Sequence, residues 1–214
     1  MVESQSGHYI IPSAPDASAD KDEMGMFLRK TRLEREPLAV TMSGVRMGER
    51  VLQIGLDDAR RIALIAAKSG LTGTAAIVVR DAAAAARVQQ AIADAGALAE
   101  VHVVHGGELP FPNAAFDAIV VHETSQTIAS PDAATRAHWL RECERLLRGG
   151  GRLVAIEPGE PHGLRSWLTG SGKGSGAVAD SEGVMASLRA GGFPTVRLLG
   201  DREGLRFVEG LKSN

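Results

Sequence analysis

The sequence predicts an α/β domain that is doubly wound around a mainly parallel sheet. From residue 49 to residue 158, short runs rich in Val, Ile and Ala alternate with longer segments of helical character. Near-continuous apolar strands separated by helices are typical of a parallel sheet that is covered on both faces. Towards the C-terminus, two further apolar runs are joined by only a few residues, which predicts a closing antiparallel hairpin.

The predicted elements follow one another in a regular order. Strands are expected at 50–55, 75–79, 99–106, 116–123 and 151–158, with helices at 57–70, 81–96 and 130–150. Ser130 or Asp132 is expected to cap the third of these helices, and Gly70 and Gly96 to end the first two. A last helix is expected at 181–192, before the hairpin strands at 195–200 and 205–212.

Two segments do not fit this alternation. Residues 1–23 are rich in Ser, Asp, Ala and Pro without periodicity, and they are expected to form a flexible tail before a domain at 24–214. Within that domain, a short helix is expected from residue 24 to about Pro37, because proline cannot continue the hydrogen-bond ladder. Residues 159–180 contain six glycines without a period, which predicts a flexible insertion.

Composition excludes several classes of function. The chain has 214 residues and a formal net charge of −2, which gives no electrostatic reason to expect a nucleic-acid partner. The single cysteine, Cys143, excludes an internal disulfide, and no His, Asp or Glu residues have metal-ligand spacing. No segment has the roughly 18–20 apolar residues that cross a bilayer, and no signal-peptide pattern begins the chain, so we expect a cytoplasmic protein. Formation of a homodimer stays open.

Three segments of the sequence resemble those of a known family. ELPFPNAAFDAIVV, RECERLLRGGGRLVAIEP and LRAGGFPTVRLLGDREGLRFVEGLK resemble segments of class I S-adenosylmethionine-dependent methyltransferases, in the type 11 and ubiquinone/menaquinone-biosynthesis-like branch. The resemblance covers residues 40–214. It implies a Rossmann-like methyltransferase fold with seven strands, S-adenosylmethionine as the cofactor, and a small molecule as the methyl acceptor.

The first cofactor-binding motif of that family is degenerate in this chain. An acidic residue followed by a Gly-x-Gly-x-Gly pattern falls here on Gln53, Gly55, Asp57 and Ala59, with Leu56 between the first two loop positions. Only the first glycine is retained. Asp57 adds a side chain where the family's backbone approaches the cofactor closely, although aspartate tolerates a tight turn better than most residues.

The resemblance also places the contacts to the adenosine part of the cofactor. The family's ribose-binding acid falls near Arg80 and Asp81. A carboxylate accepts hydrogen bonds from both ribose hydroxyls, so Asp81 would keep this contact, whereas Arg80 cannot accept and suits a phosphate better. The family's adenine-binding Gly-Asp pair falls on Val104 and His105 in this chain. Gly106 and Gly107 come directly after them.

His122 and Glu123 are the candidate catalytic residues. They stand at the carboxyl end of the fourth predicted strand, at the edge of the sheet where ligands of this fold class bind. Methyl transfer from a sulfonium needs mainly positioning of the two reactants, with a base for some acceptors. Alternatively, His122 is a structural loop histidine and Glu123 only a hydrogen-bond partner.

Two functions therefore stay open from the sequence. The first is an S-adenosylmethionine-dependent methyltransferase acting on a small molecule. The second is a catalytically silent protein of the same fold, which serves as a binding or regulatory scaffold with a lost or changed cofactor site. The sequence does not specify the methyl acceptor.

Overall fold

The computed structural model describes residues 36–106, 108–123, 132–159 and 177–214. The chain divides into two compact units, Met1–Glu36 and Pro37–Asn214, and all elements reported below belong to the second. The predicted tail at 1–23 lies outside the described residues. So do almost all of the predicted helix that ends near Pro37 and most of the predicted insertion at 159–180.

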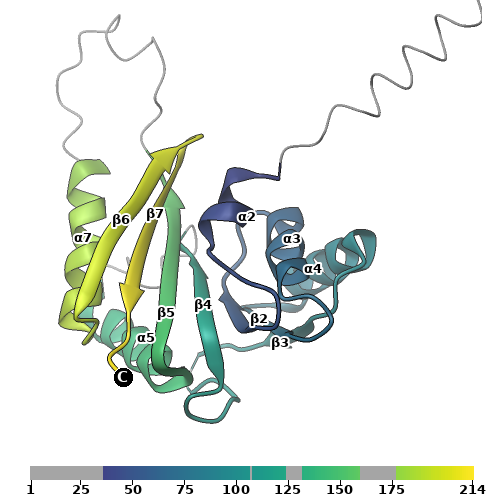
Figure 1. The fold of residues 1–214 in the computed structure, drawn as a ribbon, viewed down its shortest axis with the longest axis horizontal. Helices are drawn as coiled ribbons and strands as arrows, with labels where there is room; N and C mark the ends of the chain where they lie inside the picture. The colour runs from purple at the N-terminus through teal and green to yellow at the C-terminus, as the bar shows by residue number, and fades with distance from the viewer. Residues whose placement is uncertain (1–35, 107, 124–131, 160–176) are drawn as a thin grey trace, which may run out of the picture. The chain divides into compact units, whose positions relative to one another are not determined.

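Within the described ranges, seven strands form one sheet in the order β3-β2-β1-β4-β5-β7-β6 (Figure 1). The strands are β1 (Arg50–Ile54), β2 (Thr74–Val79), β3 (Glu100–Val103), β4 (Phe116–His122), β5 (Leu147–Pro158), β6 (Thr195–Arg202) and β7 (Leu205–Leu211). The first five strands pair in parallel, and β7 pairs antiparallel with both β5 and β6. The predicted parallel sheet and its reversed C-terminal hairpin are confirmed.

Helices cover both faces of this sheet (Figure 1). They are α2 (Leu38–Met42), α3 (Ala59–Lys68), α4 (Ala82–Ala95), α5 (Ala133–Leu146) and α7 (Ala177–Ala190). Successive residues of a strand point to opposite faces. In β1, Leu52 and Ile54 therefore pack into the core under α5 and α7, while Val51 packs with Ile65 of α3 on the other face.

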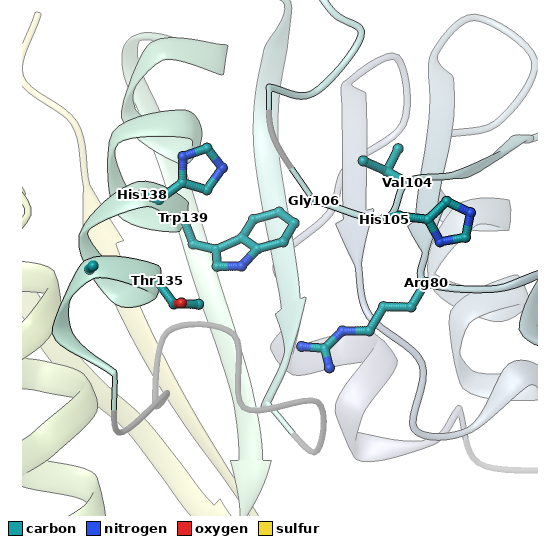
Figure 2. Close-up of a pocket in the computed structure, with 8 residues that line it drawn as sticks. Arg80, Val104, His105, Gly106, Thr135, His138 and Trp139 are labelled. Atoms are coloured by element: carbon teal, nitrogen blue, oxygen red, sulfur yellow. The ribbon is translucent and has the colours of Figure 1, made fainter.

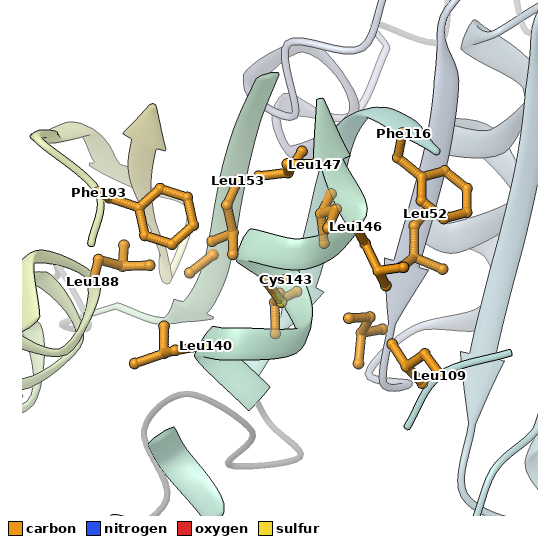
Figure 3. Packing of buried hydrophobic residues seen from close by; sticks show 14 of the residues in the cluster. Leu52, Leu109, Phe116, Leu140, Cys143, Leu146, Leu147, Leu153, Leu188 and Phe193 are labelled. Carbon is orange, nitrogen blue, oxygen red and sulfur yellow. The ribbon is translucent and has the colours of Figure 1, made fainter. Parts of the chain in front are cut away.

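The core between the sheet and helices α5 and α7 is one continuous cluster of buried side chains (Figure 3). Cys143, Leu146 and Leu147 are fully buried there, and Phe193 closes the layer near α7. On the opposite face, α3 and α4 supply a core made mainly of alanine, valine and isoleucine. Because both faces are buried, the strands need not alternate between apolar and polar residues, which accounts for the apolar runs in the sequence.

Aspartates begin three of the helices. The carboxylates of Asp58, Asp81 and Asp132 accept hydrogen bonds from backbone N–H groups in the first turns of α3, α4 and α5. Of the two caps predicted for α5, Asp132 is the one observed. Gly96 ends α4 in the left-handed conformation, with φ of 61°, a geometry that costs glycine little because it has no side chain.

Several elements differ from the sequence-based expectation. Helix α5 ends at Leu146 and β5 begins at Leu147, because Leu147 already has extended backbone angles. Helix α7 begins at Ala177, before the expected residue 181. The short helix α2 was not predicted; it begins directly after Pro37, a position at which proline is compatible with a helix start.

Candidate functional site

A pocket of about 580 Å³ opens at the carboxyl ends of β2 and β3 (Figure 2). Arg80, Val104, His105 and Gly106 line it from the strand ends, and Ala134, Thr135, His138 and Trp139 line it from α5. The chain runs outward from β1 through β2 to β3, then returns to the other side of β1 as β4. Ligands of open α/β sheets bind at such a switch in strand order, and the volume is in the range of small-molecule sites.

The pocket brings together some of the predicted cofactor residues and not others. Arg80, His105 and Gly106 line it, and Gly107 lies outside the described residues. The remaining predicted site residues are absent from the described pocket lining: Gln53, Gly55, Leu56, Asp57, Asp81, His122 and Glu123.

The loop after β1 turns at Gly55. This glycine has a φ of 90°, a conformation that side chains rarely allow, and its N–H donates to the carbonyl of Val78 over 3.0 Å. Leu56 then packs against the core under α3 and α4. The one glycine of the family motif that the chain retains therefore stands at the position that requires it.

Asp57 is held inside the protein by charged and polar neighbours. Its side chain is only 7% exposed, forms an ion pair with Arg61 of α3, and has Oδ1 3.1 Å from Nδ1 of His122. Burial raises the pKa of Asp57, but contacts with His122, the backbone N–H of Asp58 and the Arg61 guanidinium outweigh this and lower the pKa to about 2. The loop thus carries a carboxylate whose charge is largely balanced.

His122 extends this network into the sheet. Its ring is fully buried, and Nε2 lies 3.1 Å from Oε1 of Gln53 in β1. The Gln53 amide nitrogen donates in turn to the carbonyl of Ile62 in α3 over 2.9 Å. Glu123 is also buried, with 3% of its surface exposed. The sequence predicted His122 and Glu123 at the carboxyl edge of the sheet. Their catalytic roles stay a prediction.

Arg80 and Asp81 have different surroundings. Arg80 follows β2 directly and extends into the space between the strand ends and α5 (Figure 2). Asp81 caps α4, and its Oδ1 accepts a hydrogen bond from the N–H of Ala84 over 2.7 Å. Of these two candidates for the ribose contact, Arg80 is the one that lines the pocket.

The wall supplied by α5 was missed by sequence reasoning. Thr135, His138 and Trp139 stand at i, i+3 and i+4, so they share one face of the helix. The ring of His138 packs at an angle against that of Trp139, with centroids 5.8 Å apart. A polar and aromatic group at helical spacing was the available signal, but only the fold reveals that it faces Arg80.

In the part of the chain that the structure describes, no group of three or more His, Cys, Asp or Glu residues is arranged to hold a metal ion. No described helix combines the length and the apolar character that crossing a membrane would require.

The sheet order, the reversed C-terminal hairpin and a pocket at the carboxyl edge define a Rossmann-like methyltransferase domain. Comparisons with known proteins agree. Residues 54–155 match a family described as "Methyltransferase domain". The ubiquinone/menaquinone biosynthesis C-methyltransferase UbiE of Chromobacterium violaceum is 32% identical over 120 residues, which are 55% of this chain and 46% of that protein. The chain thus spans about half the length of the curated relatives it matches.

Solved structures share the fold at low sequence identity. A SAM-dependent methyltransferase from Aquifex aeolicus superposes with a TM-score of 0.61 at 16% identity, covering 89% of this chain and 97% of that one. A SAM-dependent O-methyltransferase from Thermotoga maritima gives 0.60 at 14% identity, covering 90% and 71%. The chain thus has the fold of class I S-adenosylmethionine-dependent methyltransferases, and its residues 54–155 are similar to the methyltransferase-domain family.

The position and volume of the pocket suit the family's cofactor, but the polarity of the expected ribose contact is changed. Gly55, outside the described lining, keeps the tight turn of the loop after β1, and the adenine contact of His105 stays a prediction. At the ribose, however, no carboxylate stands among the described lining residues, and Arg80 offers donors instead. A ribose hydroxyl both donates and accepts, so it can bind Arg80 only as an acceptor.

Proposed function

We propose that this protein is an S-adenosylmethionine-dependent methyltransferase that acts on a small molecule. The observation that carries the proposal is the pocket between the carboxyl ends of β2 and β3 and helix α5, which the predicted residues Arg80, His105 and Gly106 line. Its volume suits a small-molecule ligand. The similarity of residues 54–155 to the methyltransferase-domain family makes S-adenosylmethionine the ligand to test first.

In this proposal, the adenosine part of the cofactor lies between the strand ends and α5. Arg80 donates to the ribose oxygens, and His105 with Gly106 borders the adenine; Gly107 stays a predicted neighbour. Gly55 gives the loop after β1 its tight turn next to this site. When bound, S-adenosylmethionine supplies the electrophilic methyl group, and the protein supplies orientation and exclusion of water.

His122 is proposed to act by positioning. Because its ring touches both Asp57 in the loop and Gln53 in β1, it fixes the loop against the sheet. Glu123, the next residue, remains the candidate base for an acceptor that must lose a proton. A positioning role for His122 fits its complete burial better than direct contact with an acceptor.

The acceptor is proposed to be a small molecule in the cytoplasm. A net charge of −2 gives no attraction to nucleic acid. The relative from Chromobacterium violaceum is a C-methyltransferase of ubiquinone/menaquinone biosynthesis. A biosynthetic small molecule that is methylated on carbon is therefore the first acceptor class to test.

Calorimetric titration of the full chain tests the proposal. S-adenosylmethionine and S-adenosylhomocysteine should each bind with a micromolar Kd, and His105→Ala should weaken binding about tenfold because one hydrogen bond is lost. Arg87→Gln is the control, since Arg87 is exposed on α4 and does not line the pocket. Absence of binding for both ligands at millimolar concentration would overturn the proposal.

A second candidate is a catalytically silent member of the family. Two observations favour it: the described pocket lining contains no carboxylate for a ribose, and the Asp57 carboxylate is engaged within the protein. Such a protein would keep the fold and bind a different ligand. The same titrations discriminate the two candidates, because only the methyltransferase must bind S-adenosylmethionine.

A further inference from the structure

Helix α5 supplies an aromatic wall that the family resemblance did not predict. Trp139 lines the pocket together with Thr135 and His138 of the same helix. It lies outside the three segments that resemble the family, because the second of them begins at Arg141. The role of Trp139 therefore has to be inferred from its contacts.

The fold holds the Trp139 indole in place. The side chain is partly buried and packs against the core between the sheet and α5. The His138 ring lies against it at an angle of 66° between the two ring planes. A side chain that is already fixed loses little conformational freedom when a ligand binds to it, so Trp139 is preorganised for a contact.

Open space borders this wall of the pocket. Figure 2 shows the Trp139 indole extending from α5 into the space between that helix and the strand ends. On the strand side, Gly106 has no side chain. Beyond its chain neighbours, no atom of the described chain lies within 4 Å of the position that a Cβ would take there. The pocket thus has room for a flat ring between the indole and the strand ends.

The charges around the pocket do not decide such a contact. Arg80 lines the pocket, and the carboxylates of Asp81 and Asp132 cap α4 and α5. Stacking on an indole needs a π-face on the ligand and no charge. A neutral purine such as adenine meets this requirement whatever the balance between the arginine and the two aspartates.

We propose that Trp139 binds the adenine ring of S-adenosylmethionine by stacking on it. The choice of adenine rests on the proposed function, which assigns this pocket to the adenosine part of the cofactor. Trp139 is then a residue that determines specificity, because it favours ligands that carry a flat base. The methionine part of the cofactor is bound by other residues.

Tryptophan fluorescence tests this contact without any change at Trp139. The second tryptophan, Trp167, lies outside the described residues, and Trp167→Phe leaves Trp139 as the only indole of the full chain. Adenosine should quench the emission of this variant, because a stacked base quenches an excited indole, whereas ribose should not. In calorimetry, adenosine should bind at least about fivefold more tightly than ribose, which is the lower limit for stacking of one base. Emission that stays unchanged with adenosine at millimolar concentration would overturn the proposal.

Two substitutions separate the aromatic face from its packing. Trp139→Phe keeps a flat ring, whereas Trp139→Leu keeps only an apolar side chain against the core. Trp139→Leu should weaken adenosine binding at least about fivefold and leave ribose binding unchanged, while Trp139→Phe should weaken adenosine binding no more than about twofold. Arg87→Gln is the control, and thermal unfolding followed by circular dichroism shows that each variant folds. Equal adenosine affinities of Trp139→Leu and Trp139→Phe would refute stacking.

S-adenosylhomocysteine distinguishes the stacking contact from the methyltransferase function. If this ligand binds in calorimetry but leaves the emission of Trp139 unchanged, the methyltransferase proposal stands and the stacking contact fails. If adenosine quenches the emission and S-adenosylhomocysteine does not bind, the stacking contact stands and the methyltransferase proposal fails. Quenching by both ligands, with the Kd that calorimetry gives for each, is the result expected.

Discussion

Asp57→Asn offers the sharpest test of the network that holds the loop after β1. The substitution keeps the size and shape of the side chain while removing its charge. In the folded protein, the Asp57 carboxylate contacts Arg61 and His122 and has a pKa of about 2, compared with 3.8 for a free aspartate. The lower pKa means that the ionised form of the Asp57 side chain stabilises the folded state more than its protonated form does.

The size of the effect follows from this difference in pKa. Each tenfold difference in proton affinity corresponds to about 1.4 kcal/mol, so ionised Asp57 should stabilise the folded state by about 2 kcal/mol at neutral pH. Because the folded-state pKa is depressed, the contribution is complete above pH 4 and is lost as the pH falls towards 2. At pH 3, about half of it should remain.

Urea unfolding of both proteins at pH 7, 5 and 3 measures this contribution directly. Other carboxylates also titrate in this range, but they are common to both proteins and cancel in the difference between them. Asp58→Asn is the matched control: Asp58 is an exposed helix cap, and asparagine caps about as well as aspartate. A wild-type advantage over Asp57→Asn that is the same at pH 7 and pH 3 would refute the reasoning.

Three further predictions concern stability and reactivity. Burial raises the pKa of the Cys143 thiol, so it should react with iodoacetamide only after the protein unfolds, as mass spectrometry can show. Arg145→Ala removes hydrogen bonds to Glu142 and to the 109–113 segment, and should lower the free energy of unfolding in urea by about 2 kcal/mol. Lysine at this position (Arg145→Lys) should recover less than half of that stability, and full recovery would contradict a role for the guanidinium group. Gly183 in α7 has open space around it, so Gly183→Ala should stabilise the protein by about 0.5–1 kcal/mol. Gly73→Ala would press against backbone carbonyls and should destabilise it by about 1–3 kcal/mol. A higher melting temperature for Gly73→Ala than for Gly183→Ala would contradict the packing.

The sequence predicted the fold because the responsible signals are local. Apolar runs between helices indicate a parallel sheet wherever they occur, and a connection as short as that between Arg202 and Leu205 forces the two strands to run in opposite directions. The turn itself places Glu203 and Gly204 at positive φ, as tight hairpins require. Neighbouring residues carry all of this information.

The candidate site could be predicted only in part. The resemblance to known methyltransferases led to Arg80, His105 and Gly106, which line the pocket. It also led to His122, for which sequence spacing indicated a place at the sheet edge, while the structure has it fully buried. A strand residue lies on one face or the other according to register, and one residue of shift reverses the face.

The sequence by itself determined the order of strands and helices along the chain, the covered parallel sheet, the reversed hairpin and the resemblance to class I methyltransferases. Tertiary structure decided which side chains meet. Gln53 and His122 are 69 residues apart and touch because β1 and β4 are adjacent in the sheet. Trp139 faces Arg80 because α5 lies beside the carboxyl ends of β2 and β3. Local propensity acts within a few residues, whereas such contacts depend on the register and packing of distant segments, which only the folded chain specifies.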